Sequence, residues 1–295
     1  MRTQPAPLQP PVARASSPWR ESSRVFRSNR AAVFGLGLLL GLIAMLLFGP
    51  SVYGVKAFDI VAEPFTAPFI DPRVWLGTDY LGRDVLAGVL VGGRVTLMVG
   101  LSSAAVAVAI GVTVGATAGF FGGWVDALLT RLIELFQVLP ALLLSMVLVS
   151  LFSPSLQVVV LAIGIVAWTS TARLARAEFM RLRHLEYVNA ARTMGAGSLR
   201  LMLREILPNA LPPLIVSATL IIGSAILFEA GLSFLGLSDA NVMSWGMMIG
   251  NNRRNVLDCW WAVTFPGLAI FATVLAVSLI GDGLNDAFNP KLQLR

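Results

Sequence analysis

Six long runs of apolar residues, almost free of charge, dominate the 295-residue chain and restrict what it can fold into. A hydrocarbon core about 30 Å thick requires roughly 20 apolar residues in a helix that crosses it. Membrane-spanning strands would instead show alternation over about 10 residues, so the sequence predicts an all-α integral membrane protein with six transmembrane helices. The predicted spans are Ala31–Tyr53, Val95–Phe121, Leu132–Phe152, Leu156–Thr171, Leu211–Leu237 and Trp261–Gly281. The fourth run is short, and we expect it to continue as a helix beyond Thr171.

The basic residues are distributed unevenly between the two sides of this arrangement. One side carries Arg2, Arg14, Arg20, Arg24, Arg27, Arg30, Arg131, Arg173, Arg176, Arg181, Arg183, Arg192, Arg200, Arg204, Lys291 and Arg295. The other side carries Lys56, Arg73, Arg83, Arg253 and Arg254, with Arg94 at the boundary. An excess of arginine and lysine marks the cytoplasmic side, so we expect both termini and the loop 172–210 in the cytoplasm. The basic residues behind the formal charge of +6 then set the topology and contact anionic lipid. No nucleic-acid partner is expected.

The spans predict one transmembrane domain, 31–288, between two cytoplasmic tails. Residues 1–30 are rich in proline, serine and arginine and predict a mostly disordered tail. No cleavage site ends the first apolar run, so this run is expected to remain as an anchor. The first extracytoplasmic loop is expected over 54–93, and residues 289–295 form the C-terminal tail.

A polar stretch, Glu186–Pro208, separates the fourth and fifth apolar runs. Gly195 and Gly197 divide it into two short helical segments, and Ser198 can cap the second. The predicted apolar stripes are Tyr187, Ala191 and Met194 in the first segment and Leu199, Met202, Leu203, Ile206 and Leu207 in the second. Helices this short are marginal in water, and the neighbouring spans cannot cover both stripes. We therefore expect a docking partner; the alternative is an amphipathic segment that lies on the membrane surface.

Glu134 and Glu229 are carboxylates within predicted spans, where a charged residue is a functional candidate by default. Glu134 lies three residues from Arg131, which favours a local ion pair, and Pro140 should kink the same span. Glu229 has no basic residue within helical reach. We expect it either to face a water-filled translocation path or a partner chain, or to make a structural hydrogen bond.

Small residues recur at four-residue intervals in the second span, at Ala107, Gly111, Gly115 and Gly119. Such residues form one face of a helix and let two helices approach closely in lipid. Two interpretations remain open, packing within the chain and an interface with another subunit. The single cysteine, Cys259, excludes an intrachain disulfide, and no metal site is expected.

The polar stretch resembles the cytoplasmic loop of binding-protein-dependent ABC importers. That loop has the pattern E-A-A, three residues, glycine, nine residues and I-x-L-P, and Ala190, Ala191, Gly195, Leu207 and Pro208 match it in register. Two positions depart from the pattern. Asn189 stands at the usual glutamate and Glu205 at the usual isoleucine, with Ile206 one place later.

Most of the remaining chain resembles the C-type permease subunit of the dipeptide, oligopeptide and nickel branch of these importers. The matching segments are WLGTDYLGRDVL, GGRVTLMVGL, GFFGGWVD, SFLGL, SWG, FPGLAIF and GDGLNDAFNPK, in this order. Asn285 and Asn289 replace residues that are usually charged in the last segment, so ion pairs of the tail motif are not expected.

The resemblance implies the type I ABC importer permease fold in a bacterial cytoplasmic membrane. It also implies a heterodimer with a homologous second permease, two cytoplasmic ATPases that use ATP and magnesium, and an extracytoplasmic substrate-binding protein. The ATPase-coupling residues would be Glu186, Asn189, Ala190, Ala191, Gly195, Ala196, Gly197, Leu207 and Pro208. Dipeptides or short oligopeptides are the expected substrates, and nickel chelates or glutathione are the alternatives within the same family.

The chain itself is not expected to be an enzyme or to bind a cofactor. It contains no G-x-x-x-x-G-K-[ST] phosphate loop and no Gly-Lys dipeptide. Two other functions compete with this interpretation. An ion-coupled secondary transporter would usually show internal repeats, and we find none; a membrane scaffold would tolerate bulk at the Gly195 turn, whereas a coupling loop would not.

Overall fold

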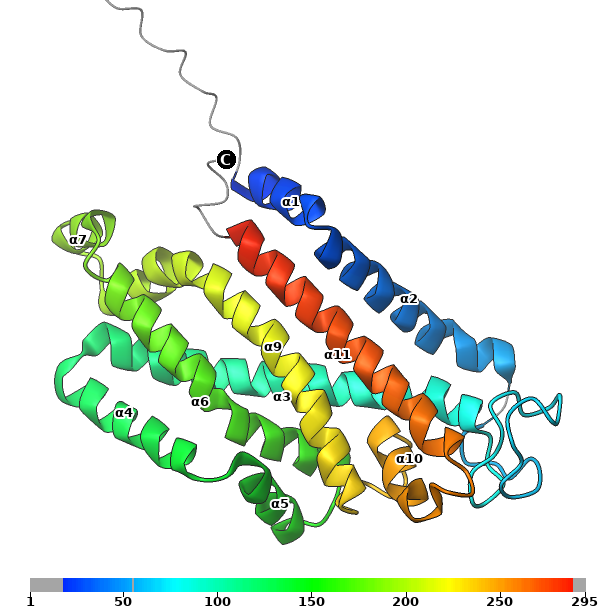
Figure 1. Cartoon of the computed structure of the whole chain (residues 1–295). Helices are drawn as coiled ribbons and strands as arrows, with labels where there is room; N and C mark the ends of the chain where they lie inside the picture. The colour runs from blue at the N-terminus through cyan, green and yellow to red at the C-terminus, as the bar shows by residue number, and fades with distance from the viewer. Residues whose placement is uncertain (1–17, 55, 289–295) are drawn as a thin grey trace, which may run out of the picture.

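The computed structural model describes residues 18–54 and 56–288, and these residues form helices joined by loops (Figure 1). The elements are α1 (Pro18–Ser28), α2 (Arg30–Tyr53), α3 (Val85–Phe121), α4 (Gly123–Val138), α5 (Ala141–Leu151), α6 (Leu156–Leu182), α7 (Glu186–Thr193), α8 (Ser198–Arg200), the π-helix η1 (Leu201–Ile206), α9 (Leu207–Phe234), α10 (Trp245–Asn252), the 3₁₀-helix η2 (Arg253–Asn255) and α11 (Trp261–Phe288). Extended pairing within the described ranges is limited to two isolated bridges, which join Ile60 to Arg83 and Thr78 to Asp84.

Five continuous helices of the described chain are long and apolar enough to cross a membrane. They are α2, α3, α6, α11 and the run Ser198–Phe234, which contains α8, η1 and α9. The prediction of an all-helical membrane protein is therefore confirmed. The helix α3 begins ten residues before the predicted Val95, because the side chain of Asp84 accepts hydrogen bonds from the amides of Leu86 and Ala87 and caps it there.

The third predicted span is broken. Helices α4 and α5 are long and apolar enough to cross a membrane only when taken together, and they are bent by 88° at the break between them. Pro140 lies at this break with φ −59°; it has no amide hydrogen and cannot continue the hydrogen-bonded ladder of α4. Its predicted kink is thus a complete interruption, and the described chain has five continuous candidate spans, or six if the bent pair α4–α5 is counted as one span.

The face of small residues on α3 packs against α6 within the chain. Ala107 is completely buried. A β-carbon added at Gly111 would lie 2.6 Å from Cβ of Thr171, and one added at Gly119 would lie 2.5 Å from the carbonyl oxygen of Arg176. Of the two interpretations open from the sequence, intrachain packing is the one that uses this face, since α6 already covers it.

Helix α1 differs from the tail expected over residues 1–30. Residues 18–28 are helical, and Asn29 joins this helix to the bundle: its Oδ1 accepts from the amide of Ala32 at 3.1 Å and its Nδ2 donates to Asp286 of α11 at 2.9 Å. Composition alone missed this anchor because its partner is 257 positions away. The rest of the predicted N-terminal tail and the predicted tail 289–295 lie outside the described residues.

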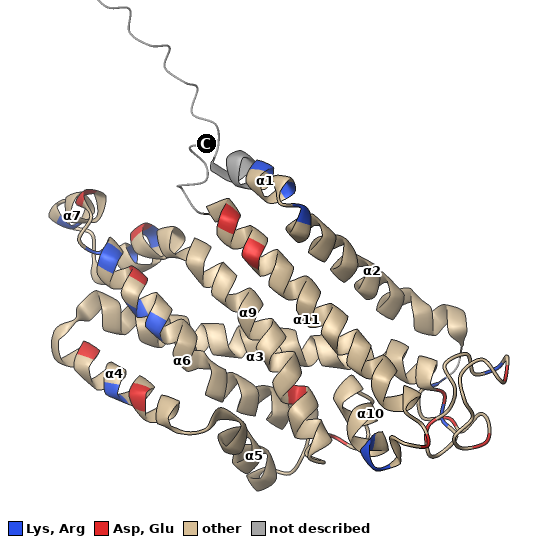
Figure 2. Ribbon diagram, in the orientation of Figure 1, with Lys and Arg blue, Asp and Glu red and all other residues tan. Residues whose placement is uncertain are grey.

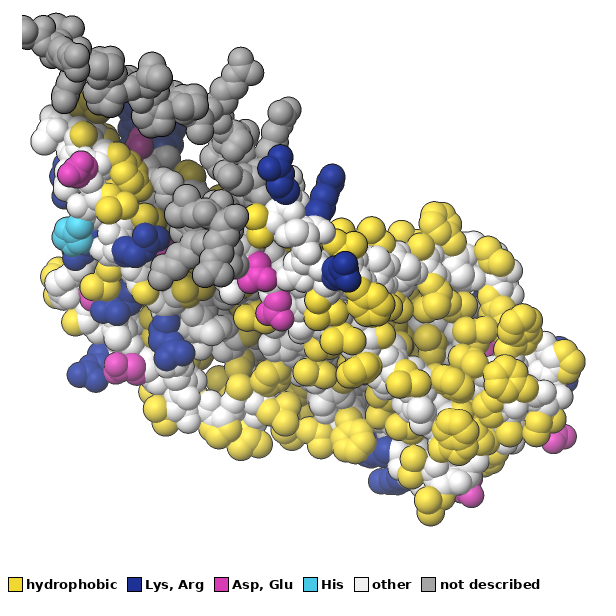
Figure 3. Space-filling view, turned by 45° about the horizontal axis from the view of Figure 1, so that its top comes forward, with side chains coloured by type: hydrophobic (Ala, Val, Ile, Leu, Met, Phe, Trp, Pro, Cys, Tyr) yellow, Lys and Arg dark blue, Asp and Glu magenta, His cyan; other side chains and the backbone are white. Residues whose placement is uncertain are grey.

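Charged and apolar side chains are distributed unevenly along the length of the molecule. Lysine and arginine gather near α1, α4, α6 and α7 at one end and near α10 and the α2–α3 loop at the other (Figure 2). The face in Figure 3 shows hydrophobic side chains over the middle and charged side chains toward the ends. The predicted ion pair within α4 is present, with 2.9 Å between Arg131 Nη1 and Glu134 Oε2.

Candidate functional site

The segment α7–η1, residues 186–206, lies between α6 and α9 and projects at the end of the molecule opposite α10 (Figure 1). Its base is held by apolar packing. Val188 and Ile206 are completely buried, in one cluster with Phe179 of α6, Leu214 of α9 and Phe120 of α3. The segment is therefore rooted in three long helices.

The π-helix η1 changes which residues form this base. The amide of Leu207 donates to the carbonyl oxygen of Met202, five residues earlier, and this spacing turns Leu201 and Ile206 to the same buried side. The second predicted stripe, placed at α-helical spacing, divides between this base and the outer surface: Ile206 is buried, whereas Leu199 and Leu203 are exposed.

The members of the first predicted stripe also divide between the base and the outer surface of the segment. Ala191 is buried, whereas Tyr187 and Met194 are exposed. Val188, one position after Tyr187, faces inward instead. The hydroxyl of Tyr187 contacts η1 by donating to the carbonyl oxygen of Glu205 at 3.4 Å.

Gly195 ends α7 in a Schellman motif. The amide of Ala196 donates to the carbonyl oxygen of Ala191 at 3.1 Å, and the amide of Gly195 donates to that of Arg192 at 3.0 Å. Gly195 has φ +87°, a conformation that residues with a β-carbon adopt only with strain. No atom beyond its chain neighbours lies within 4 Å of the place its β-carbon would take, so the turn is both specified in shape and open to solvent.

The outer surface of the segment mixes apolar and cationic side chains. Met194 is 82% exposed, Leu199 69% and Leu203 52%, and Arg192 and Arg200 beside them are exposed as well. We call Met194, Leu199 and Leu203 the exposed triad. The remaining predicted coupling residues divide by burial: Glu186, Asn189, Ala190, Gly195, Gly197 and Pro208 are exposed, and Ala196 and Leu207 are half-buried.

Two arginines, Arg176 of α6 and Arg183 directly after it, fasten the base to neighbouring helices, and the sequence predicted neither role. Arg183 Nη1 donates to the carbonyl oxygens of Gly119 and Phe120 at 2.9 and 3.1 Å, at the end of α3. Arg176 forms a two-bond ion pair with Asp126 of α4, at 2.5 and 2.7 Å. The partners are 50 or more positions apart, so the only signal in the sequence was the cluster of basic residues.

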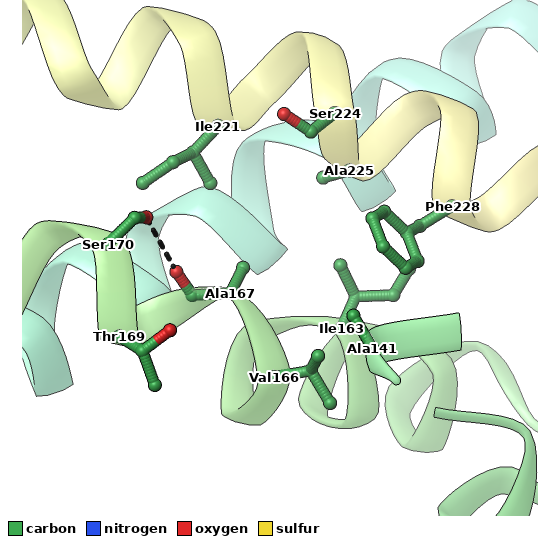
Figure 4. Close-up of a pocket in the computed structure, with 10 residues that line it drawn as sticks. All are labelled: Ala141, Ile163, Val166, Ala167, Thr169, Ser170, Ile221, Ser224, Ala225 and Phe228. Carbon is green, nitrogen blue, oxygen red and sulfur yellow. Dashed lines mark hydrogen bonds between the residues drawn. The ribbon is translucent and has the colours of Figure 1, made fainter. Parts of the chain in front are cut away.

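A pocket of about 560 Å³ opens between the start of α5, α6 and α9. Figure 4 shows its lining, in which hydroxyl groups of Thr169, Ser170 and Ser224 lie among aliphatic side chains and the ring of Phe228. No charged side chain lines it. This arrangement offers hydrogen bonds without committing the pocket to one charge.

Glu229 lies outside this pocket, on the side of α9 that faces α10. Its side chain is buried, and its Oε1 accepts from the hydroxyls of Ser233 at 2.8 Å and Ser244 at 2.7 Å. Ser244 also caps α10 by accepting from the amide of Met247 at 3.1 Å. Glu229 Oε2 has no partner among the described residues and borders a small cavity that Asp239 also lines.

Residues 111–294 match the family described as the binding-protein-dependent transport system inner membrane component, and residues 17–70 match the N-terminal transmembrane domain of oligopeptide transport permease C.

Two curated relatives align over nearly their whole length. The dipeptide transport system permease protein DppC of Alkalihalophilus pseudofirmus is 36% identical over 98% of this chain and 96% of its own. The di/tripeptide transport system permease protein DppC of Pseudomonas aeruginosa is 40% identical over 98% and 97%. A solved chain of the MetNI methionine ABC transporter, in inward-facing conformations, is 18% identical, with a TM-score of 0.49 over 66% of this chain and 96% of that one.

A component of this kind works with ATPase and binding-protein partners and has no catalytic role of its own. The chain belongs to the family of multi-pass inner membrane components of binding-protein-dependent transport systems, and it is a permease subunit of an ABC transporter.

Proposed function

We propose that the chain is the C-type permease of an importer of dipeptides and short oligopeptides, and that a cytoplasmic ATPase binds the segment α7–η1. The peptide substrate is inferred from the names of the two relatives. The observation that supports the coupling role is the combination of a buried base, around Val188 and Ile206, with an exposed triad of apolar side chains. Apolar groups on an otherwise polar loop are typical of a protein interface.

The proposed orientation places the α7 end in the cytoplasm. Arginines of α1, α4, α6 and α7–η1 lie toward this end, and the positive-inside rule assigns such an end to the cytoplasm. Both tails, 1–30 and 289–295, would lie on this side of the domain 31–288, and the α2–α3 loop on the other; α3 begins at Val85, so this loop is shorter than the predicted 54–93. The exposed triad then faces the ATPases, and α10 with the α2–α3 loop faces the binding protein.

Movement of the ATPase would reach the pocket through a short chain of contacts. The base of α7–η1 packs on α6 and α9, and the same two helices line the pocket around Ser170 and Ser224. A push at the Gly195 turn therefore acts on the pocket walls as a rigid-body displacement between two states. In this scheme the partner ATPases bind ATP and magnesium, and the permease contributes the docking segment and the walls of the pocket.

A second permease would complete the path. Helices α4 and α5 leave apolar side chains uncovered, including Leu135 and Leu143, and the pocket opens beside the start of α5. A homologous chain packed there would close the pocket into a path lined from both sides. Glu229, which faces α10, is proposed as a structural acceptor outside this path.

The coupling role is tested by Gly197→Trp in the reconstituted complex with its cognate binding protein. Gly197 has φ −69° and open space around its missing β-carbon. Tryptophan here therefore adds bulk without backbone strain, whereas Gly195→Trp would add bulk and backbone strain together. We expect ATP hydrolysis stimulated by substrate and binding protein to fall at least about tenfold, which corresponds to roughly 1.4 kcal/mol of lost coupling.

Gly37→Trp is the matched control, because Gly37 of α2 is exposed and also has nothing within 4 Å of its missing β-carbon. Unchanged stimulation in Gly197→Trp would overturn the coupling role, whichever substrate is carried. The substrate is tested separately, by thermal stabilisation of the cognate binding protein with dipeptides, tripeptides, glutathione and nickel chelates. Stabilisation by chelates or glutathione alone would overturn the peptide assignment and leave the coupling role intact.

A further inference from the structure

Arg94 carries a charge within a helix long and apolar enough to cross a membrane. It follows the start of α3 by nine residues, which is about 13 Å along the helix axis, and its side chain is exposed. The ion pairs of the described chain do not include Arg94. A guanidinium at this depth needs a partner from protein, water or lipid.

Two backbone carbonyls of α2 fix where the guanidinium lies. Arg94 Nε donates to the carbonyl oxygen of Leu46 at 2.6 Å, and Nη2 donates to that of Leu47 at 2.7 Å. Pro50 explains the first bond. The carbonyl of Leu46 is four residues before Pro50, which has no amide hydrogen to offer it. Arg94 therefore replaces the hydrogen bond that Pro50 removes from α2, and it is held in place by doing so.

The held guanidinium borders an open apolar groove between α2 and α3, with an empty volume of about 870 Å³. The groove is lined by Ile43, Leu46, Leu47, Leu97, Met98 and Leu101, with Arg94 and Ser102 as the polar members. Leu47, Met98 and Leu101 are exposed in the described chain. Aliphatic walls of this kind suit a hydrocarbon chain, because they offer it dispersion contacts and only two polar side chains.

We propose that this groove binds one anionic phospholipid, with its phosphate at Arg94 and an acyl chain along α2 and α3. Charge complementarity supports a lipid: Nη1 of Arg94 makes no bond to α2 and remains as a donor, and a phosphate oxygen is a strong acceptor for a guanidinium. The depth agrees. Leu46 precedes the end of α2 by seven residues, about 10 Å along the axis, a distance that a long side chain and local bilayer thinning can bridge.

The lipid belongs to the leaflet at the α10 end, since α2 ends there and Arg94 lies in the first turns of α3. The site lies away from both the exposed triad and the pocket of Figure 4. Its occupancy depends on neither the coupling role nor the peptide substrate. A lipid bound at this site would instead hold α2 against α3, and its occupancy would depend on the content of anionic lipid in the membrane.

The test uses the complete transporter in nanodiscs of phosphatidylglycerol or phosphatidylcholine, followed by native mass spectrometry of the lipid retained on release. Arg94→Gln is expected to reduce retained phosphatidylglycerol about fivefold, which is what roughly 1 kcal/mol from one cation gives. Phosphatidylcholine retention should not change. Arg131→Gln is the matched control, because Arg131 is an exposed cation on α4, away from the groove.

A double variant separates loss of lipid from loss of folding. Pro50→Ala restores an amide that can donate to Leu46, so Pro50→Ala with Arg94→Gln should keep the thermal stability of the parent while still losing phosphatidylglycerol. Equal phosphatidylglycerol retention in this double variant and the parent would overturn the proposal. The proposal would also be overturned if Arg94→Gln released the second permease from the complex and left phosphatidylglycerol retention unchanged, because the groove would then be a protein interface.

Discussion

The segments α7–η1 and α10 are both short helical connections between long helices, at opposite ends of the molecule (Figure 1), yet they treat their apolar side chains in opposite ways. In α10, Trp245, Met247 and Met248 are buried. In α7–η1 the exposed triad faces outward, and only the base is covered. One connection completes the core of its own chain, and the other presents apolar surface for a partner to complete.

Hydrogen bonds sharpen the contrast. Trp245 Nε1 donates to the carbonyl oxygen of Val89 at 2.9 Å, and Glu229 accepts from the Ser244 cap of α10. A β-carbon added at Gly246 would lie 2.7 Å from Cα of Ala230, so α10 lies directly on the backbone of α9. The turn at Gly195 has no such contact. A helix tied on two sides moves with the bundle, whereas a turn rooted only at its base can transmit a force applied at its tip.

The largest expected effect comes from removing the side chain that holds α10. Trp245→Ala should lower the free energy of unfolding by about 3–5 kcal/mol, because a completely buried aromatic side chain leaves a cavity and an unpaired carbonyl at Val89. Met194→Ala, the matched change in α7–η1, should stay within about 0.5 kcal/mol. Denaturant titration of the purified subunit in mixed micelles measures both. Similar losses in the two variants would mean that the two connections do not differ in this way.

A smaller effect separates the two glycines of the exposed turn. Gly195→Ala should destabilise the turn by about 1–2 kcal/mol, because alanine is strained at φ +87°. Gly197→Ala should stabilise it by about 0.4–1 kcal/mol, since φ −69° suits alanine and the unfolded chain loses freedom. The rate of hydrogen exchange at the Ala196 amide, which donates to the carbonyl oxygen of Ala191, measures both changes. Equal exchange rates in the two variants would contradict the Schellman assignment.

The features of the sequence that depend on local pattern were the ones that could be predicted. Apolar runs located the spans, the two glycines located the exposed turn, and the spacing of Arg131 and Glu134 gave their ion pair. Each of these rests on contacts within a few residues or on the length of a run. The match of Ala191 and Gly195 to a known loop pattern agrees with their positions in one Schellman motif.

Features that depend on distant partners, or on a change of helical period, could not be predicted. Leu201, at the start of the π-helix, is buried and Leu203 is exposed, and the wider turn rotates the side chains that follow Leu201 away from α-helical spacing. A structural hydrogen bond was one of the expectations for Glu229, and Ser233 is a local donor to it; the second donor, Ser244, comes from the α10 cap and could not be named from the sequence. The hydrogen bond from Arg94 to the carbonyl of Leu46, which Pro50 leaves without a helical donor, joins residues 48 positions apart, and no periodicity reveals it.

The smallest expected effect is a pH dependence confined to the α10 end. Burial raises the pKa of Asp79, in the loop before α3, above its ordinary value of 3.8, although its Oδ1 accepts from the amides of Leu81 and Arg83 at 2.8 and 2.9 Å. The folded state then holds the proton more tightly than the unfolded state. Stability should therefore fall as pH rises from about 3.8 through the raised pKa, and stay level above it.

Asp79→Asn keeps the accepting oxygen and removes the titration, so this fall should disappear from a plot of thermal midpoint against pH. Asp71 is a control of opposite sign in the same loop: hydrogen bonds from Arg73 hold its pKa below 3.8, so its contribution is present above that pH and is lost as pH falls below it. Asp71→Asn should thus alter only the acid limb. A fall between pH 4 and neutrality that persists in Asp79→Asn would locate the titrating group elsewhere, and the buried character of the α10 end would no longer account for it.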